Sequence, residues 1–279
     1  VQDPAGAAHP LELPGPALAL ALAARGEGLA AGLADGTVLR WRAPAAAPAR
    51  LSLGAAIVGL TLLPDDAGLV ARTRDSRIVA IRGEVVTPLA TIDASQGMPY
   101  RAAISPVVAH PSAPVAAIAG DDTLLHHDFA TGATTRRPVL LTHLPALAYS
   151  PGGRLAVSLA GTRLLVLDAA ADPGRELALP EEARALTWLD DQELIVLGDR
   201  GSLLRADLVA GEVALLRRDW HPLGELPTEL VLTARPTGAV ALHTRADHDL
   251  VEHPADVVHR DPAQLAAWLQ TRGAALGGP

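Results

Sequence analysis

PVAAIAGDDTLLHHDFATG, residues 114–132, holds one complete strand–turn–strand–turn unit. Its first seven residues alternate apolar and small side chains, and two aspartates follow as a turn. Residues 123–129 are typical of a second strand, after which a Thr–Gly pair turns the chain again. The unit therefore serves as a template for searching the rest of the sequence.

Related units recur along the chain. They are DGTVLRWRA around Trp41, SRIVAIRGE around Ile81, GTRLLVLDAAADPG around Leu167, GSLLRADLVAGE around Ala206 and, more weakly, DHDLVEHPAD around Val251. Steps of roughly 40 to 46 residues are the period of four-stranded propeller blades. The sequence thus predicts an all-β fold, a β-propeller of about six four-stranded blades, over residues 17–258.

The two ends of the chain lack this period. Residues 1–16 hold four prolines and two glycines, which indicates an extended lead-in that could supply a ring-closing strand. In residues 259–279, Asp261 and Pro262 precede AQLAAWLQTRG, which predicts a short C-terminal α-helix and a tail. We expect the apolar face of this helix to pack on its own domain more often than on a partner.

Composition excludes several classes of protein. The chain has no cysteine, so disulfides, thiolate nucleophiles and thiolate metal sites are absent. A net charge of −8 offers no basic face for nucleic acid, so we expect no nucleic-acid partner. The apolar stretch 17–24 is too short to span a membrane. We expect a cytoplasmic protein with no membrane partner.

Two long connections, residues 93–101 and 217–228, join the end of one repeat to the start of the next and hold several of the few bulky side chains. In a propeller such connections share one rim, and long loops with rare aromatic residues tend to carry recognition. The predicted partner-binding residues are Met98, Tyr100, Arg217, Arg218, Trp220 and His221, with Trp268 from the C-terminal helix. The alternative is that each aromatic side chain folds back onto its own repeat.

Other suggestive residues favour structural roles. Of the adjacent His126, His127 and Asp128, at most two side chains can converge on a metal, because neighbours on a strand face opposite ways. Ser150 precedes a proline and has no evident base, so a nucleophilic role is disfavoured. The last repeat contains four histidines, and none shows the spacing of zinc ligands on a helix. pH sensing or weak metal binding by these residues is therefore the less favoured interpretation. They are His243, His248, His253 and His259.

Glycines and paired acids are explained in the same way. No helix follows Gly26, Gly28 and Gly32, so strand packing is favoured over phosphate binding. The acidic pairs near repeat turns are expected to be solvated rather than to bind calcium: Asp65 with Asp66, Glu181 with Glu182, and Asp190 with Asp191. We expect no metal and no cofactor.

The repeats resemble the WD-repeat family of β-propellers. The resemblance lies in YSPGGRLAVSLAGTRLLVLD, GLADGTVLRW, GDDTLLHHDFATG and RADLVAGEV. Of the family's Trp–Asp pair, Trp41 keeps the tryptophan, while Asp128, Asp168 and Asp207 keep the aspartate. The family's Gly–His pair is missing, so its internal hydrogen-bond network is not expected here. The resemblance implies that Asp128 fixes a turn by hydrogen bonds.

The resemblance also implies a non-catalytic scaffold, since WD-repeat proteins generally bind other proteins and bacterial members often accompany signalling or defence domains. We therefore expect a protein–protein interaction module in a larger bacterial assembly, not an enzyme. One alternative is a six-bladed hydrolase or lactonase with a central divalent metal, although the chain has no asparagine and no repeated inward-facing Asp, Glu or His. Another is an architectural subunit that docks through its C-terminal helix.

Overall fold

The protein is described here by a computed structural model. The described residues are 13–22, 28–42, 46–64, 67–91, 106–120, 122–142, 145–169 and 172–217, together with the backbone of 229–234, 240–246 and 249–254. Every named element within these residues is a β-strand, so the all-β prediction is confirmed for this part of the chain. Residues 1–12 and 255–279 lie outside it, so the early part of the lead-in and the C-terminal helix stay predictions.

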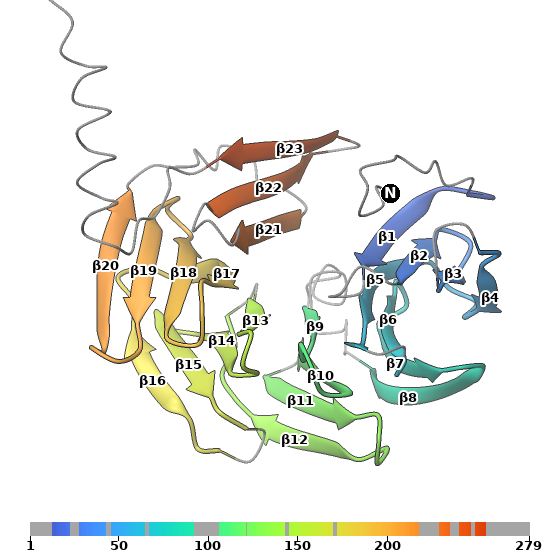
Figure 1. The fold of residues 1–279 in the computed structure, drawn as a ribbon, viewed down its shortest axis with the longest axis horizontal. Coiled ribbons are helices and arrows are strands. Elements are labelled where there is room, and N and C mark those ends of the chain that lie inside the picture. The colour runs from blue at the N-terminus through green and yellow to red at the C-terminus, as the bar shows by residue number, and fades with distance from the viewer. Residues whose placement is uncertain are drawn as a thin grey trace, which may run out of the picture. The chain divides into compact units, whose positions relative to one another are not determined.

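The strands form six antiparallel sheets in which each strand pairs with the next one in sequence (Figure 1). The first sheet contains β1 (Ala17–Leu22), β2 (Leu29–Leu33), β3 (Thr37–Trp41) and β4 (Ala49–Ser52). The second contains β5 (Ile57–Leu62), β6 (Leu69–Thr73), β7 (Arg77–Arg82) and β8 (Val85–Thr91). The third contains β9 (Val107–Ala109), β10 (Val115–Gly120), β11 (Thr123–Asp128) and β12 (Thr134–Pro138).

The remaining sheets repeat the same order. The fourth contains β13 (Leu147–Tyr149), β14 (Leu155–Leu159), β15 (Arg163–Leu167) and β16 (Arg175–Ala178). The fifth contains β17 (Ala183–Trp188), β18 (Glu193–Gly198), β19 (Leu203–Asp207) and β20 (Glu212–Arg217). The sixth contains β21 (Glu229–Ala234), β22 (Val240–Ala246) and β23 (Asp249–Pro254). The predicted four-stranded unit is therefore confirmed in five sheets, and the sixth has three described strands.

In the first five sheets the second and third strands are largely buried on both faces. All residues of β2, β6 and β14 are buried, although adjacent side chains point to opposite sides. Strands buried on both faces read as continuous apolar runs, as in LAAGL and LAVSL. The fourth strands are mostly exposed and carry more polar residues, for example ARLS in β4.

Tight hairpins join the second strand of a sheet to the third. In the first sheet Gly36 has a φ of 87°, and the Thr37 N–H donates to Asp35 Oδ1 over 2.9 Å. A Cβ at Gly36 would lie 2.7 Å from the Ala55 nitrogen, so the position also lacks space for a side chain. The Asp–Gly hairpin predicted from the sequence is thus confirmed.

The chain divides into two compact units, Val1–Arg184 and Ala185–Pro279. Within the first unit, neighbouring sheets pack face to face. Val38 and Ile57 belong to the cluster between the first and second sheets, and Ile78 and Ile118 to the cluster between the second and third. Leu124 and Leu155, with further residues, fill the space between the third and fourth sheets.

Aliphatic side chains and alanine build these clusters, as the composition predicts. Phe129, the single phenylalanine of the sequence, is buried and packs between the second and third sheets. Gly32 allows close approach, because a Cβ there would lie 2.4 Å from Ile57 Cγ2. The strand-packing interpretation of Gly32 is therefore confirmed. Among the described residues no helix is long and apolar enough to cross a membrane.

Candidate functional site

The structure places one of the seven predicted partner-binding residues. Arg217 is the last residue of β20, and its side chain is exposed. The other six lie outside the described residues: Met98, Tyr100, Arg218, Trp220, His221 and Trp268. Their convergence on one rim remains a prediction, and β20 is the element that leads into the connection 217–228.

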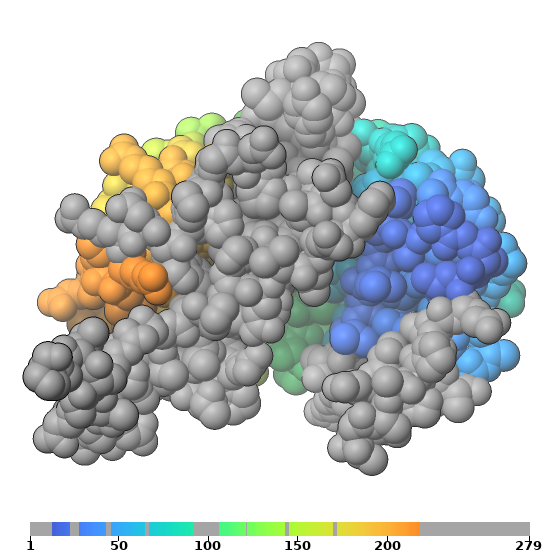
Figure 2. All heavy atoms as spheres, turned by 90° about the horizontal axis from the view of Figure 1, so that it is seen from above, coloured from blue at the N-terminus to red at the C-terminus, as the bar shows by residue number. Residues whose placement is uncertain are grey.

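β20 is an exposed outer strand. It lies at the end of its sheet and pairs with β19 alone among the described strands. Leu215 is 46% exposed and Leu216 is 38% exposed, and Val209 in the preceding turn is 71% exposed. Figure 2 shows atoms of the last fully described residues, in orange, at the surface on the face seen there. Apolar side chains at an outer edge are typical of a surface that pairs with another chain.

A bulge shapes the end of this strand. Leu203 pairs with Arg217 and Leu204 pairs with Leu215, which leaves Leu216 as the extra residue of β20. A bulge increases local twist and limits how far an edge can be extended. The pairing surface that β20 offers is therefore short.

Two other outer strands contain charged residues or proline near their middle or end, although β8 also exposes Val85 and Val86. β12 has Arg136 and Arg137 and ends at Pro138, and β8 contains Pro88. Proline and charged side chains are the usual means of preventing edge-to-edge pairing. Sequence analysis missed the contrast, although the apolar run VALL at the position of a fourth strand was the signal that could have revealed it.

Several aspartate, serine and histidine side chains of the described chain hold turns together. Asp128 Oδ1 accepts the Ala130 N–H over 2.7 Å, and Asp207 Oδ1 accepts the N–H groups of Ala210 over 2.9 Å and Val209 over 2.8 Å. These backbone donors hold the pKa of both carboxyl groups below the usual value. The turn-fixing role that the WD-repeat resemblance implies for Asp128 is thus confirmed, and Asp207 repeats it in the fifth sheet.

The turn after the first strand is held by a different side chain in each of three sheets. His110 Nδ1 accepts the Ala113 N–H over 2.9 Å in the third sheet, and Ser150 Oγ accepts the Arg154 N–H over 3.0 Å in the fourth. Asp190 Oδ1 accepts the Gln192 N–H over 2.8 Å in the fifth. Ser150 is fully buried and caps this turn, which agrees with the structural role expected from sequence.

The paired acids do not behave uniformly. Asp190 fixes a turn, as described above, whereas Glu181 is only 5% exposed. The prediction that Glu181 is solvated is therefore wrong, because surrounding parts of the protein cover this side chain although Pro180 beside it is exposed. Asp65 and Asp66 lie outside the described residues.

His126 and His127 face opposite sides of β11, as expected for a strand. The His127 ring packs edge-to-face on Phe129 with centroids 4.7 Å apart, and its Nδ1 lies 2.9 Å from Thr134 Oγ1. His126 is 6% exposed, and its Nε2 has no hydrogen-bond partner among the described residues. Burial, with the nearby Arg137 charge, lowers the pKa of His126 to about 4. His126 is therefore neutral at neutral pH.

Arginines of one sheet bond to the backbone of the next. Arg136 Nη2 donates to the Leu89 carbonyl over 3.1 Å, which links the third sheet to the second. Arg82 Nη1 donates to the Phe129 carbonyl over 3.0 Å between the same two sheets. Arg137, the neighbour of Arg136, donates in the other direction to the carbonyls of two residues before β16, Asp172 and Pro173.

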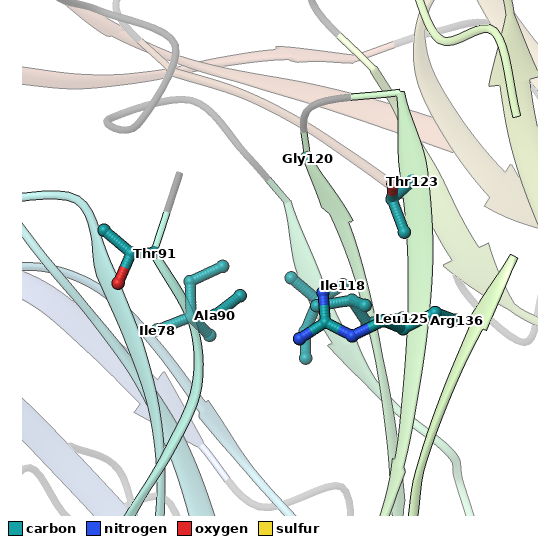
Figure 3. A pocket seen from close by; sticks show the side chains of 8 residues that line it. All are labelled: Ile78, Ala90, Thr91, Ile118, Gly120, Thr123, Leu125 and Arg136. Atoms are coloured by element: carbon teal, nitrogen blue, oxygen red, sulfur yellow. The ribbon is translucent and has the colours of Figure 1, made fainter. Parts of the chain in front are cut away.

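A small cavity lies beside this link, between the second and third sheets (Figure 3). Its volume is about 60 Å³, and Ile78, Ile118 and Leu125 form its apolar wall. The Arg136 side chain extends across it toward the second sheet (Figure 3). Since Arg136 is itself exposed, water solvates its charge, and the space holds about two to four water molecules rather than a metabolite.

No group of three or more His, Asp or Glu side chains that could hold a metal ion occurs among the residues described. Of the four histidines of the last repeat, His243 and His253 lie in strands whose backbone alone is described, and His248 and His259 lie outside the described residues. The cluster predicted there is not tested.

No family model matches the chain, and a comparison with curated proteins finds no relative.

Proposed function

We propose that the chain is a non-catalytic protein–protein interaction scaffold, a β-propeller of the WD-repeat type that works in the cytoplasm within a larger bacterial assembly of the signalling or defence kind. The observation that carries this proposal is the exposed apolar outer strand β20, which ends at Arg217 where the connection 217–228 begins. In addition, the chemistry-bearing side chains described above are used to fix turns and to link sheets.

The burial of the first sheet supports a closed ring. Val38 packs toward the second sheet, whereas Leu29, Leu39 and Trp41 belong to the opposite face. These three side chains are only 3% to 6% exposed. An open stack of sheets would leave the outer face of its first member in water. We propose that about six blades close over this face, with help from the lead-in, whose Leu13 packs there.

A closed ring would make the outer strands a rigid platform. A partner that binds a preformed edge meets little ordering cost on the scaffold side. An extended segment can add to an exposed strand through main-chain hydrogen bonds, with the neighbouring apolar side chains supplying specificity. Leu215 and Leu216 are the side chains placed for this role in β20.

The test is quantitative capture of partners by the full chain. A variant with Leu215→Ser and Leu216→Ser is compared with the wild type after cross-linking and mass spectrometry of what is bound. The matched control is Val85→Ser with Val86→Ser on β8, where the two valines are 66% and 37% exposed. We expect the β20 variant to lose a specific partner by about tenfold or more, while the β8 variant retains it.

Equal loss in both variants would show that apolar exposure in general, not β20, drives capture. Retention by both would place the interaction elsewhere. Trp220→Ala and Tyr100→Ala test the two predicted loops in the same assay. A loss of capture without a change in melting temperature would assign those side chains to the same partner, whereas unfolding would assign them to the core.

A further inference from the structure

The outer edge of the fifth sheet is complementary to itself. β20 reads EVALLR. An antiparallel copy, related by a twofold axis through Ala214, places Glu212 opposite Arg217 and Val213 opposite Leu215, while Leu216 remains the extra residue of the bulge. Each charge then meets an opposite charge and each apolar side chain meets another. Such cross-strand pairs stabilise antiparallel sheets, whereas like charges in opposite positions destabilise them.

The edge is accessible for this pairing. β20 lies at the end of the sheet order, and its outer side presents the backbone groups with which another strand can pair. Leu215 and Leu216 are both more than one-third exposed, so their burial by a second copy would remove apolar surface from water.

Other outer strands of the described chain lack this complementarity. The same operation on β12 (TTRRP) places Arg136 opposite its own copy, and on β8 (VVTPLAT) it places Pro88 opposite its own copy. In β16 (RELA) an axis through Glu176 sets this residue against its own copy, and an axis through Leu177 sets Glu176 against Ala178. In β4 (ARLS) an axis through Arg50 sets this arginine against its own copy, and an axis through Leu51 sets it against Ser52.

We propose that two copies of this chain associate by antiparallel pairing of β20 with β20 in an isologous, twofold-symmetric contact. The inference deepens the proposed interaction function, on which it rests, by naming a second copy as the occupant of this edge. The strand has six residues and a bulge at Leu216, so the contact is small. We expect a dissociation constant of about 1 to 100 μM, as for small interfaces.

Charge exchange tests the register directly. Sedimentation equilibrium of the full chain is measured over a concentration series at about 0.15 M salt, where exposed charges further apart than the Debye length are screened. Glu212→Arg and Arg217→Glu each place like charges together, and we expect each to raise the dimer dissociation constant by about tenfold or more. The double exchange re-forms both pairs and should return the constant to within about threefold of the wild type.

Arg50→Glu provides the matched control, because it makes the same charge change on the exposed outer strand β4. We expect it to leave the dissociation constant unchanged. Circular dichroism of all variants before sedimentation confirms that they remain folded. The self-pairing proposal is wrong if the doubly exchanged variant dimerises as weakly as the single variants. It is also wrong if the wild type is monomeric up to about 500 μM.

The result separates this proposal from the scaffold proposal. A monomeric chain that still loses a different protein when Leu215 and Leu216 are changed to serine would overturn self-pairing and support the scaffold. A dimer that obeys the charge exchange, in a chain whose partner capture ignores those two leucines, would support self-pairing and overturn β20 as the scaffold's docking strand.

Discussion

β12 and β20 occupy the same place in their sheets, yet they treat the edge in opposite ways. Each is a fourth strand, paired on one side with the third strand of its own repeat. β12 uses Arg136 and Arg137 to reach carbonyl groups of the neighbouring sheets. β20 leaves Leu215 and Leu216 exposed. The comparison teaches that position in a repeat fixes backbone pairing, while the side chains decide whether an edge bonds to neighbouring sheets or exposes apolar surface.

The largest expected effect is on stability. It tests whether β12 and β20 differ only at their exposed edges or also in the packing of the core behind them. Leu124 on β11 pairs with Arg137 of β12, and Leu204 on β19 pairs with Leu215 of β20. Both side chains are fully buried. Leu124→Ala and Leu204→Ala should each lower the free energy of unfolding by about 2 to 5 kcal/mol, measured by urea denaturation. A cost below about 1 kcal/mol at either site would show that the interior behind that edge is loosely packed.

The next prediction concerns how the free energy of unfolding depends on pH. The third and fifth sheets should differ here, because they bury different ionisable groups. His126 lies two residues before Asp128 in the third sheet, and Arg205, ion-paired with Glu193, lies two residues before Asp207 in the fifth. The folded pKa of His126, about 4, is below the unfolded value near 6.5. The contribution of neutral His126 to the free energy of unfolding is therefore fully present above pH 6.5. It is lost as the pH falls through 4, by about 3 kcal/mol in total.

Urea denaturation at a series of pH values measures this loss, and His126→Leu should remove most of the slope between pH 6.5 and 4. Burial also lowers the pKa of His110 and His127, so a residual slope of the same sign is expected. Parallel curves for the wild type and His126→Leu would contradict the assignment.

A smaller effect compares Arg137, next to the end of β12, with Arg217 at the end of β20. Arg137→Ala removes charge-assisted bonds to the carbonyls of Asp172 and Pro173 and should cost about 1 to 3 kcal/mol of unfolding free energy. Arg217→Ala on the exposed end of β20 should cost about 1 kcal/mol or less. Equal costs in chemical denaturation would mean that the internal links of β12 do not stabilise the fold.

The smallest effect is expected at the leucines themselves. Leu215→Ser should change the free energy of unfolding by about 0.5 kcal/mol or less, because the side chain is 46% exposed in the folded chain. Thermal denaturation at low protein concentration makes the measurement without contribution from association. A loss above about 2 kcal/mol would identify Leu215 as a core residue and remove the basis of both proposals about β20.

Local patterns predicted the strands well. The Asp–Gly turn at residues 35–36 predicted the hairpin between β2 and β3, and the third strand, expected at residues 37–42, is observed at Thr37–Trp41. The fourth strand, expected at residues 50–53, is observed at Ala49–Ser52. Such features depend on a few neighbouring residues, and the repeat period supplied the rest.

The candidate site was less predictable, because it depends on contacts between distant segments. Nothing adjacent to Arg136 and Arg137 in sequence shows that one reaches Leu89 and the other reaches Asp172. Likewise, the burial of Glu181 depends on the surrounding parts of the protein that cover it. The rare aromatic residues led to the prediction of a binding site in the loops. The exposed edge of β20 depends instead on its position as the last strand of its sheet.

The arginine links described between neighbouring sheets have a bearing on how the repeats can evolve. Their acceptors are main-chain carbonyls, which every residue type provides. A substitution in the accepting repeat therefore leaves the bond in place and needs no compensating change in the arginine that donates it. Duplicated units joined in this way can drift apart in sequence while the order of their sheets persists, which is the pattern this chain displays.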